Sequence, residues 1–560
     1  MEHLLGAANR GSISTAAFDI GNSCRFDNTN TSIPDSLHFT LGTPTNDKIF
    51  TLSFWVKMTP NPTLESGSAN NMILVGSQQS GGYGESINMT RNSAGDATLN
   101  FKLNWLEESV GYTNATARQF RDHSAWYHLM FITETTNGTA ADRQRFYVNG
   151  VRETFTGYEY SENATPRAFN TSGCVHRIGS GGVNNSQNNR GYQGYMAEMH
   201  FVDGTAQAVG DFGETDSDSG IWKPKEASGI TYGTNGWYLD FADSSAMGND
   251  VSGNNNDFTL VGIGATNQTT DTPTNNFATV NALDHPDTPM VFSEGNLKVE
   301  GDNVSMSTFW ISRGKWYYEW KITDLASGFG YHTWWGLMSY KYPTQAYGTN
   351  GSEGVWAYQD PLATVGSPKT MAFRIVPQSG NCFKNSNNGQ SSNDRMAGQD
   401  FTMQEGCVVR ICIDYDNGAA WQGVWEGEPN ASNGAYIGGD GTENNGHGWW
   451  NYHTVAASSN PATGRWPAIG RGSAGTSYTR SVTTQDGTQS DLDLRDVVPG
   501  PVRMYQSTAI TNAESKLNYG NPTYTWSGSS YTDENGYGKF QYEPPTGFYA
   551  LCSKNLAEFG

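Results

Sequence analysis

The chain has 560 residues, which is too long for one hydrophobic core, so we expect roughly two to four domains. Only 16% of the residues are charged, whereas 12% are aromatic and 66 are glycine, a composition that favours short aromatic strands joined by Gly- and Asn-rich turns. The net charge of −21 argues against binding to nucleic acid or to anionic lipid.

The N-terminal segment, residues 1–17, shows no hydrophobic period and lacks the basic start and apolar core of a signal peptide. We therefore expect an arm or anchor there rather than an export signal. Since no apolar stretch approaches the roughly 20 residues that span a bilayer, we expect no membrane insertion. The six cysteines form no CxxC pair, which predicts buried thiols, although a bridge between Cys24 and Cys174 stays open because the sequence gives no distance.

The next part of the chain reads as an antiparallel sandwich. Apolar and polar residues alternate over 50–57 and again over 126–132, which predicts two half-buried strands. Asn149 and Gly150 stand between two strand-like runs and predict a tight hairpin, because both positions tolerate a positive φ.

The strand sequences of this region carry a family resemblance. The order "SFWVK", "WYHLMFI", "FYVNGV", "HRIGS" and "YQGYMAEMHFVDG" resembles the laminin-G/pentraxin group of concanavalin A-like jelly rolls over residues 18–205. The resemblance implies a jelly-roll fold, in which most of these aromatic residues, Trp55 and Trp126 included, build the core.

Residues 206–288 are predicted to form a linker and β-rich connector, because the part after residue 235 is too short for a complete sandwich. Within it, one glycine-bearing loop offers oxygen ligands that could hold calcium. A hydrogen-bonded surface turn is the alternative, and no other cofactor is indicated. The residues of this candidate calcium loop are Asp250, Asn254, Asn256 and Asp257.

A second alternating series follows. The order "GKWYYEWKI", "WWGLM", "GVWAY", "GCVVRICIDYDNG", "RWPAIG" and "LNYGN" resembles a SPRY domain, another antiparallel β-sandwich, over residues 289–530, with a tail at 531–560. The chain departs from that pattern at 422–451, where a long Gly- and Asn-rich insertion is expected. The fold prediction is therefore all-β, with two antiparallel β-sandwiches joined by a β-rich connector.

The chain lacks the common motifs of catalysis, namely HExxH, GxxxxGK[ST], GxSxG and a strand-borne GxGxxG. We therefore expect no catalytic residues and no enzymatic activity. A polysaccharide depolymerase stays an alternative, because the pair of carboxylates that a glycosidase needs cannot be identified among 55 acidic residues from sequence alone.

Sugar binding needs flat aromatic faces beside amide or carboxylate groups, held on rigid loops. Aromatic residues next to Gly/Asn clusters or at one face of a predicted strand are the candidates, with packing between domains or protomers as the equally weighted alternative. These candidate ligand-binding residues are Trp449, Trp450, Asn451, Tyr452, Trp335, Trp356 and Tyr358.

Two further stretches, 271–277 and 539–552, resemble phage-encoded proteins that combine these same modules. The resemblance implies a tail-fibre-like adhesin on the virion surface that binds a host glycan or receptor, with residues 1–17 contacting other virion proteins. Homo-oligomerisation is expected, since weak sugar sites gain avidity when repeated. The alternative is a structural fibre or capsid decoration protein without receptor contact.

Overall fold

The chain divides into two compact units in this computed structural model. The first comprises Met1–Asn276 and Ser293–Gly295, and the second Phe277–Phe292 and Asn296–Gly560. The structure describes residues 18–27, 35–59, 71–78, 84–91, 101–107, 112–157, 159–180, 191–282, 291–301, 304–324, 333–339, 370–375, 382–386, 405–406, 408–416, 419–425, 482–484, 487–489, 502–508 and 514–560.

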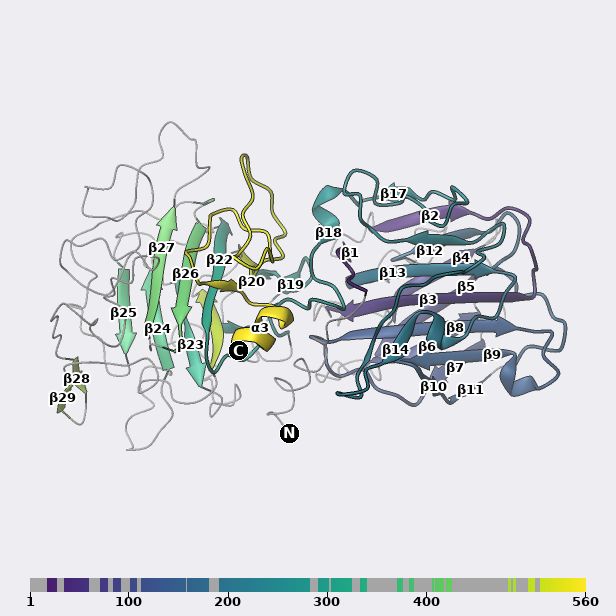
Figure 1. Cartoon of the computed structure of the whole chain (residues 1–560), viewed down its shortest axis with the longest axis horizontal. Coiled ribbons are helices and arrows are strands. Elements are labelled where there is room, and N and C mark those ends of the chain that lie inside the picture. Colours follow the sequence, from purple (N-terminus) through teal and green to yellow (C-terminus); the bar gives the residue numbers. More distant parts are fainter. Residues whose placement is uncertain are drawn as a thin grey trace. The chain divides into compact units, whose positions relative to one another are not determined.

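The first unit contains two large antiparallel sheets and a small ribbon (Figure 1). Sheet I contains, in spatial order, β10 (Val151–Glu153), β9 (Gln144–Val148), β8 (Trp126–Glu134), β3 (Ile49–Met58), β13 (Gly194–Asp203), β1 (Ser23–Phe26) and β18 (Gln268–Thr269), with β16 (Trp237–Leu239) also paired to β13. Sheet II contains β11 (Phe155–Thr156), β7 (Tyr112–Thr116), β6 (Phe101–Glu107), β5 (Gly84–Arg91), β4 (Asn71–Gln78), β12 (Val175–Ile178), β2 (Ser36–Thr40) and β17 (Thr259–Val261). The ribbon pairs β14 (Gly213–Thr215) with β15 (Trp222–Pro224).

The core of the first unit lies between sheets I and II. In β3 the side chains of Phe50, Leu52 and Phe54 join the same buried cluster as Leu74 of β4 and Ile87 of β5. Alternation along the strand places every second residue in this layer. The residues of both sheets thus build one sandwich core, as the sequence pattern predicts.

The other face of sheet I is covered as well, which corrects the expectation of half-buried strands. Trp55 of β3 and Trp126 of β8 pack with Ile20 and, from the ribbon, Trp222 in a second cluster outside the sandwich. Trp55 and Trp126 keep 4% and 9% of their surface exposed. Successive side chains along β3 and β8 therefore point into two packed layers, rather than alternately into the core and into solvent.

The segment predicted as a connector over 206–288 contributes to both units. Its strands β16, β17 and β18 pair with sheets I and II, and Trp237 is fully buried in the first core. The first unit therefore extends to Asn276 instead of ending at residue 205, and the second begins at Phe277. Residues 236–276 are too few for a sandwich of their own because their strands complete the sandwich of the first unit.

The second unit also has two principal sheets. Sheet III contains β19 (Val291–Ser293), β20 (Lys298–Glu300), β31 (Glu514–Asn518), β22 (Lys315–Asp324), β26 (Val408–Asp414) and β27 (Ala419–Trp425), and β32 (Tyr549–Ala550) pairs in parallel with β22. Sheet IV contains β21 (Val304–Met306), β30 (Val502–Thr508), β23 (Thr333–Ser339), β24 (Thr370–Ile375) and β25 (Cys382–Ser386), and β28 (Val482–Thr484) pairs with β29 (Gly487–Gln489).

The two sheets of the second unit share one core. Trp316 and Trp320 of β22 pack in the same buried cluster as Leu337 of β23 and Met504 of β30. The insertion expected from residue 422 begins later, because β27 continues to Trp425 and pairs with β26; the rest of the insertion lies outside the described residues.

Residues 531–560, predicted as a tail, are integrated into the second unit. Phe540, Phe548 and Cys552 are buried against Tyr317 of β22, and α3 (Ser553–Phe559) follows β32. Within the described residues α3 is the α-helix, alongside 3₁₀ turns at Ala140–Asp142, Val209–Asp211 and Ala265–Asn267. The all-β prediction is therefore confirmed.

The pairing of Cys24 with Cys174, which the sequence left open, is decided by the structure. Cys24 and Cys174 are separate buried thiols, Cys24 in the sandwich core and Cys174 in another cluster, so they form no bridge. Across the described parts of the chain, no helix combines the length and the apolar character needed to cross a membrane.

Candidate functional site

The first unit carries a shallow depression on the outer face of sheet I, whose lining side chains pack so closely that they leave no room for a water molecule between them. Its lining combines aromatic rings with hydroxyl, imidazole, carboxylate and ammonium groups, which is the mixture that sugar hydroxyls and sugar C–H faces require. Most of the lining is buried, whereas Lys225 at the rim is exposed. The lining residues are Phe18, Ser53, Trp55, His128, Glu198, His200, Phe212, Pro224 and Lys225.

A β-bulge in β13 shapes the depression. The pairing of β13 with β3 shifts between Ala197 and His200, and Glu198 within the shift has a φ of 48°. The extra residue changes the phase of the strand, so Met196 and Met199 both belong to the sandwich core while His200 faces the depression. A non-glycine residue in the left-handed region is strained, and such strain is concentrated at functional sites.

Two tyrosines hold the polar groups of the bulge. The Tyr238 hydroxyl donates to Glu198 Oε2 over 2.8 Å, and the Tyr232 hydroxyl lies 2.8 Å from His200 Nδ1. His200 Nε2 is 3.7 Å from Glu198 Oε2, and the His200 ring stacks on Tyr238 with centroids 4.2 Å apart. The carboxylate and the imidazole are therefore fixed in orientation before any ligand binds.

His128 contributes a neutral imidazole to the lining. Trp222 Nε1 donates to its Nδ1 over 3.1 Å, so the ring proton is on Nε2, which lies 2.8 Å from Ser53 Oγ. Burial, and secondarily the charge of His200, lowers the pKa of His128 to about 3. This tautomer cannot accept the Ser53 proton, so the pair is not arranged as a nucleophile with its base.

The candidate calcium loop is organised around Asp250. Its two carboxylate oxygens accept hydrogen bonds from Tyr238 N, Ser252 N, Ser252 Oγ and Asn256 N, at 2.8–2.9 Å. Asp257 Oδ1 accepts from Asp250 N, and the side-chain amides of Asn254 and Asn256 donate to backbone carbonyls of residues 233–236.

Donors directed at Asp250 occupy the positions that a cation would need, so these four residues do not fit a calcium ion. Their hydrogen bonds instead join the loop to the chain that precedes β16. Within the described residues, no group of three or more His, Cys, Asp or Glu side chains is placed to hold a metal ion.

The aromatic candidates for ligand binding fall mainly beyond what the structure describes. Trp449, Trp450, Asn451, Tyr452, Trp356 and Tyr358 lie outside the described residues. Trp335 lies in β23, paired with Phe373 of β24 and Gln506 of β30. These residues stay a prediction.

Sequence reasoning missed the residues of the depression. Alternation assigns His128 and His200 to the outward face of apolar strands, which is a weak signal for a polar site. The bulge at Glu198 and the covering segment with Trp222 have no counterpart in the local sequence pattern, because both depend on pairing with distant strands.

Comparison with known proteins supports the class of the first unit. Residues 28–208, about a third of the chain, match the family described as the concanavalin A-like lectin/glucanases superfamily. No curated protein matches the chain.

Solved structures similar to parts of the chain include three at low sequence identity. A heptameric SAP-like pentraxin from Limulus polyphemus is 16% identical, covers 34% of this chain and 80% of its own, and has a TM-score of 0.25. The SPRY domain of human HERC1 is 9% identical, with 42% and 96% covered and a TM-score of 0.22. Domains LG4-5 of the mouse laminin alpha1 chain are 8% identical, with 74% and 78% covered and a TM-score of 0.25.

Proposed function

We propose that the protein recognises carbohydrate and acts without catalysis as a host-recognition protein on a virion surface. The observation that carries the first part is the match of residues 28–208 to the concanavalin A-like lectin/glucanases superfamily. The shallow depression on sheet I gathers the types of group that contact sugars, aromatic rings beside Glu198 and His200, although these side chains are closely packed and mostly buried. The neutral, singly oriented His128 beside Ser53 favours binding over nucleophilic chemistry.

The virion location is the finer part of the proposal. It is supported by the order of the two sandwich modules and by the resemblance of residues 271–277 and 539–552 to phage-encoded proteins. In this proposal residues 1–17 contact other virion proteins and the protein is a homo-oligomer, which raises the avidity of weak sugar sites.

Binding of the purified full chain to a glycan array and to intact bacterial cells tests the proposal. We expect selective binding to some surface polysaccharides, competition with phage adsorption, and no release of reducing ends. Binding to no glycan and to no cell would leave a structural virion component as the better description, and released reducing ends would identify a depolymerase.

Variants locate the sugar site. If the depression binds the sugar, Glu198→Gln removes a charged acceptor while keeping the shape, so we expect affinity to fall about tenfold for the loss of a charge-assisted hydrogen bond. If the predicted aromatic loop binds it, Trp449→Ala and Trp450→Ala reduce binding instead. Trp526→Ala is the matched control, a half-buried tryptophan on a Gly/Ser-rich segment outside both candidate sites.

A further inference from the structure

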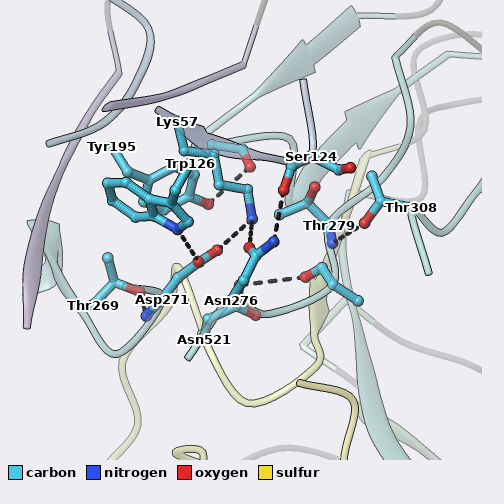
Figure 2. Close-up of polar contacts among 12 residues, drawn as sticks. Lys57, Ser124, Trp126, Tyr195, Thr269, Asp271, Asn276, Thr279, Thr308 and Asn521 are labelled. Carbon is cyan, nitrogen blue, oxygen red and sulfur yellow. Dashed lines mark hydrogen bonds and ion pairs between the residues drawn. The ribbon is translucent and has the colours of Figure 1, made fainter. Parts of the chain in front are cut away.

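A buried cluster in the first unit brings an amine, a carboxyl group and a carboxamide together (Figure 2). Lys57 extends from β3 toward the outer face of sheet I, and its side chain and that of Asp271 are both fully buried. Lys57 Nζ lies 2.7 Å from Asp271 Oδ2 and 2.7 Å from Asn276 Oδ1. A lysine is almost never fully buried unless it is paired; here the Asp271 carboxylate supplies the pairing, and the Asn276 carboxamide is a third group at the same amine.

Each of the three groups is held by another part of the unit. Trp126 Nε1 donates to Asp271 Oδ1 over 3.0 Å, and Asn276 Nδ2 donates to the carbonyl of Ser124 over 2.7 Å. The Tyr195 ring lies 5.5 Å from Lys57 Nζ. A buried ion pair requires only Lys57 and Asp271, whereas here an oriented carboxamide is added, whose nitrogen donates to Ser124 and whose carbonyl oxygen accepts from the amine.

We propose that Lys57 and Asn276 form an intramolecular isopeptide bond. Lys57 Nζ attacks Cγ of Asn276, the new N–C bond forms, and the bond from Cγ to Nδ2 breaks. The amine gives up one proton and the departing nitrogen gains one, so the products are a secondary amide and one ammonia molecule. The step needs neither oxidant nor reductant.

Asp271 is placed to carry the proton. Its Oδ2 contacts the attacking amine, and proton transfer within the ion pair produces a neutral amine beside a carboxylic acid that can protonate the leaving group. Burial lowers the pKa of Lys57, opposed by the charge of Asp271, and so favours the nucleophilic form of the amine. Fixed orientation replaces the entropy cost of bringing the reactants together, and burial protects the linkage from water.

The linkage joins parts of the chain that are far apart in sequence. Lys57 is in a central strand of sheet I, and Asn276 follows β18 at the end of the first unit, 219 positions later. The bond would therefore close the long N-terminal segment of the first unit covalently at Asn276. The cluster of Lys57, Asp271 and Asn276 shares no residue with the lining of the depression, so the inference does not depend on the proposed function.

Mass spectrometry of the purified full chain tests whether the bond between Lys57 and Asn276 forms. We expect the denatured protein to be lighter than its sequence by one ammonia, and a protease digest to contain a branched peptide that joins Lys57 to Asn276. A mass that agrees with the sequence, together with separate peptides for the two residues, would overturn the proposal. A branched peptide joining Lys57 to Asp271 with loss of water would overturn the assignment of Asn276.

Single substitutions separate the role of Asn276 as the electrophile from the role of Asp271 in proton transfer. Asn276→Ala removes the electrophile, so the chain should keep its full mass and migrate more slowly than the looped wild type on a denaturing gel. Asp271→Ala should lose the linkage while retaining both reacting residues; complete linkage in that variant would overturn the role of Asp271. Asn170→Ala is the control, because Asn170 is also buried and bound to Asp203 but has no lysine in its described contacts. This variant should retain the linkage.

Discussion

Single buried residues of the first unit determine how its stability depends on pH. His176 is fully buried, its Nδ1 accepts from Trp237 Nε1 over 3.2 Å, and burial lowers its pKa to about 3 from the ordinary 6.5. The folded protein therefore keeps His176 neutral at pH values where the unfolded chain takes up a proton. Like His128, it contributes stability that is complete above pH 6.5 and is lost as the pH falls through its folded pKa.

The substitution His176→Asn tests whether neutral, buried His176 makes the stability fall at low pH, because an asparagine side chain can accept the same indole hydrogen bond without titrating. Between the unfolded and folded pKa values the wild type should lose about 1.4 kcal/mol more per pH unit than the variant. Urea unfolding of both full chains across that pH range measures the difference.

Asp35, which is present in both the wild type and the variant, is the control for this comparison. Burial raises the pKa of Asp35 to about 6, so its contribution is present at low pH and is lost as the pH rises, in the opposite sense to histidine. Asp35 is common to both proteins and cancels in the difference. Parallel pH dependences for the two proteins would contradict a neutral, buried His176.

At the scale of elements, the hairpin of β9 and β10 links the edge of sheet I to the ribbon that covers it. Asn149 and Gly150 have φ values of 48° and 76°, which confirms the turn expected from this pair. A Cβ atom on Gly150 would meet the indole ring of Trp222 in β15. The glycine is thus required twice, once for the turn and once for the close approach of the covering segment.

Comparing Gly150→Ala with Gly173→Ala separates the cost of the positive φ from the cost of the contact with Trp222. Gly173 has a φ of 79° and open space around its hypothetical Cβ, so Gly173→Ala should cost only the conformational term of about 1 kcal/mol. Gly150→Ala adds the steric conflict and should cost about 3 kcal/mol. Thermal unfolding and near-UV circular dichroism, which reports the Trp222 environment, measure both; equal losses would show that Trp222 does not press on the turn.

At the scale of the whole molecule, the end of the chain completes the second unit through one buried carboxylate. Glu319 of β22 is 0% exposed, and burial raises its pKa while its hydrogen bonds and Arg410 oppose the rise. Most of its donors belong to the segment that follows β31, so the carboxylate fixes that segment on sheet III. The five donors are Tyr317 Oη, Asn518 Nδ2, Tyr524 Oη, Gln541 N and Tyr542 N.

Glu319→Gln keeps the size of the side chain but turns N–H groups toward some of these donors. Because buried donors then lose their acceptor, we expect the free energy of unfolding to fall by about 3 kcal/mol. Glu514→Gln is the control, since its ion pair with Lys298 is partly exposed and should contribute less than about 1 kcal/mol. Denaturant unfolding of both variants gives the comparison, and equal losses would contradict the anchoring role of Glu319.

The sequence by itself determined the strands and the class of fold. Alternation identified β3, β8, β22 and β26, and Asn149-Gly150 identified a turn, because period and turn chemistry are local properties. Only the tertiary structure decided which faces are buried, how far each unit extends, and where polar groups meet. The outer face of sheet I is covered in part by Trp222, more than a hundred residues after β3. The bulge at Glu198 arises from pairing with a distant strand, and Lys57 meets Asn276 across 219 positions. Such encounters depend on long-range topology, which no local pattern encodes.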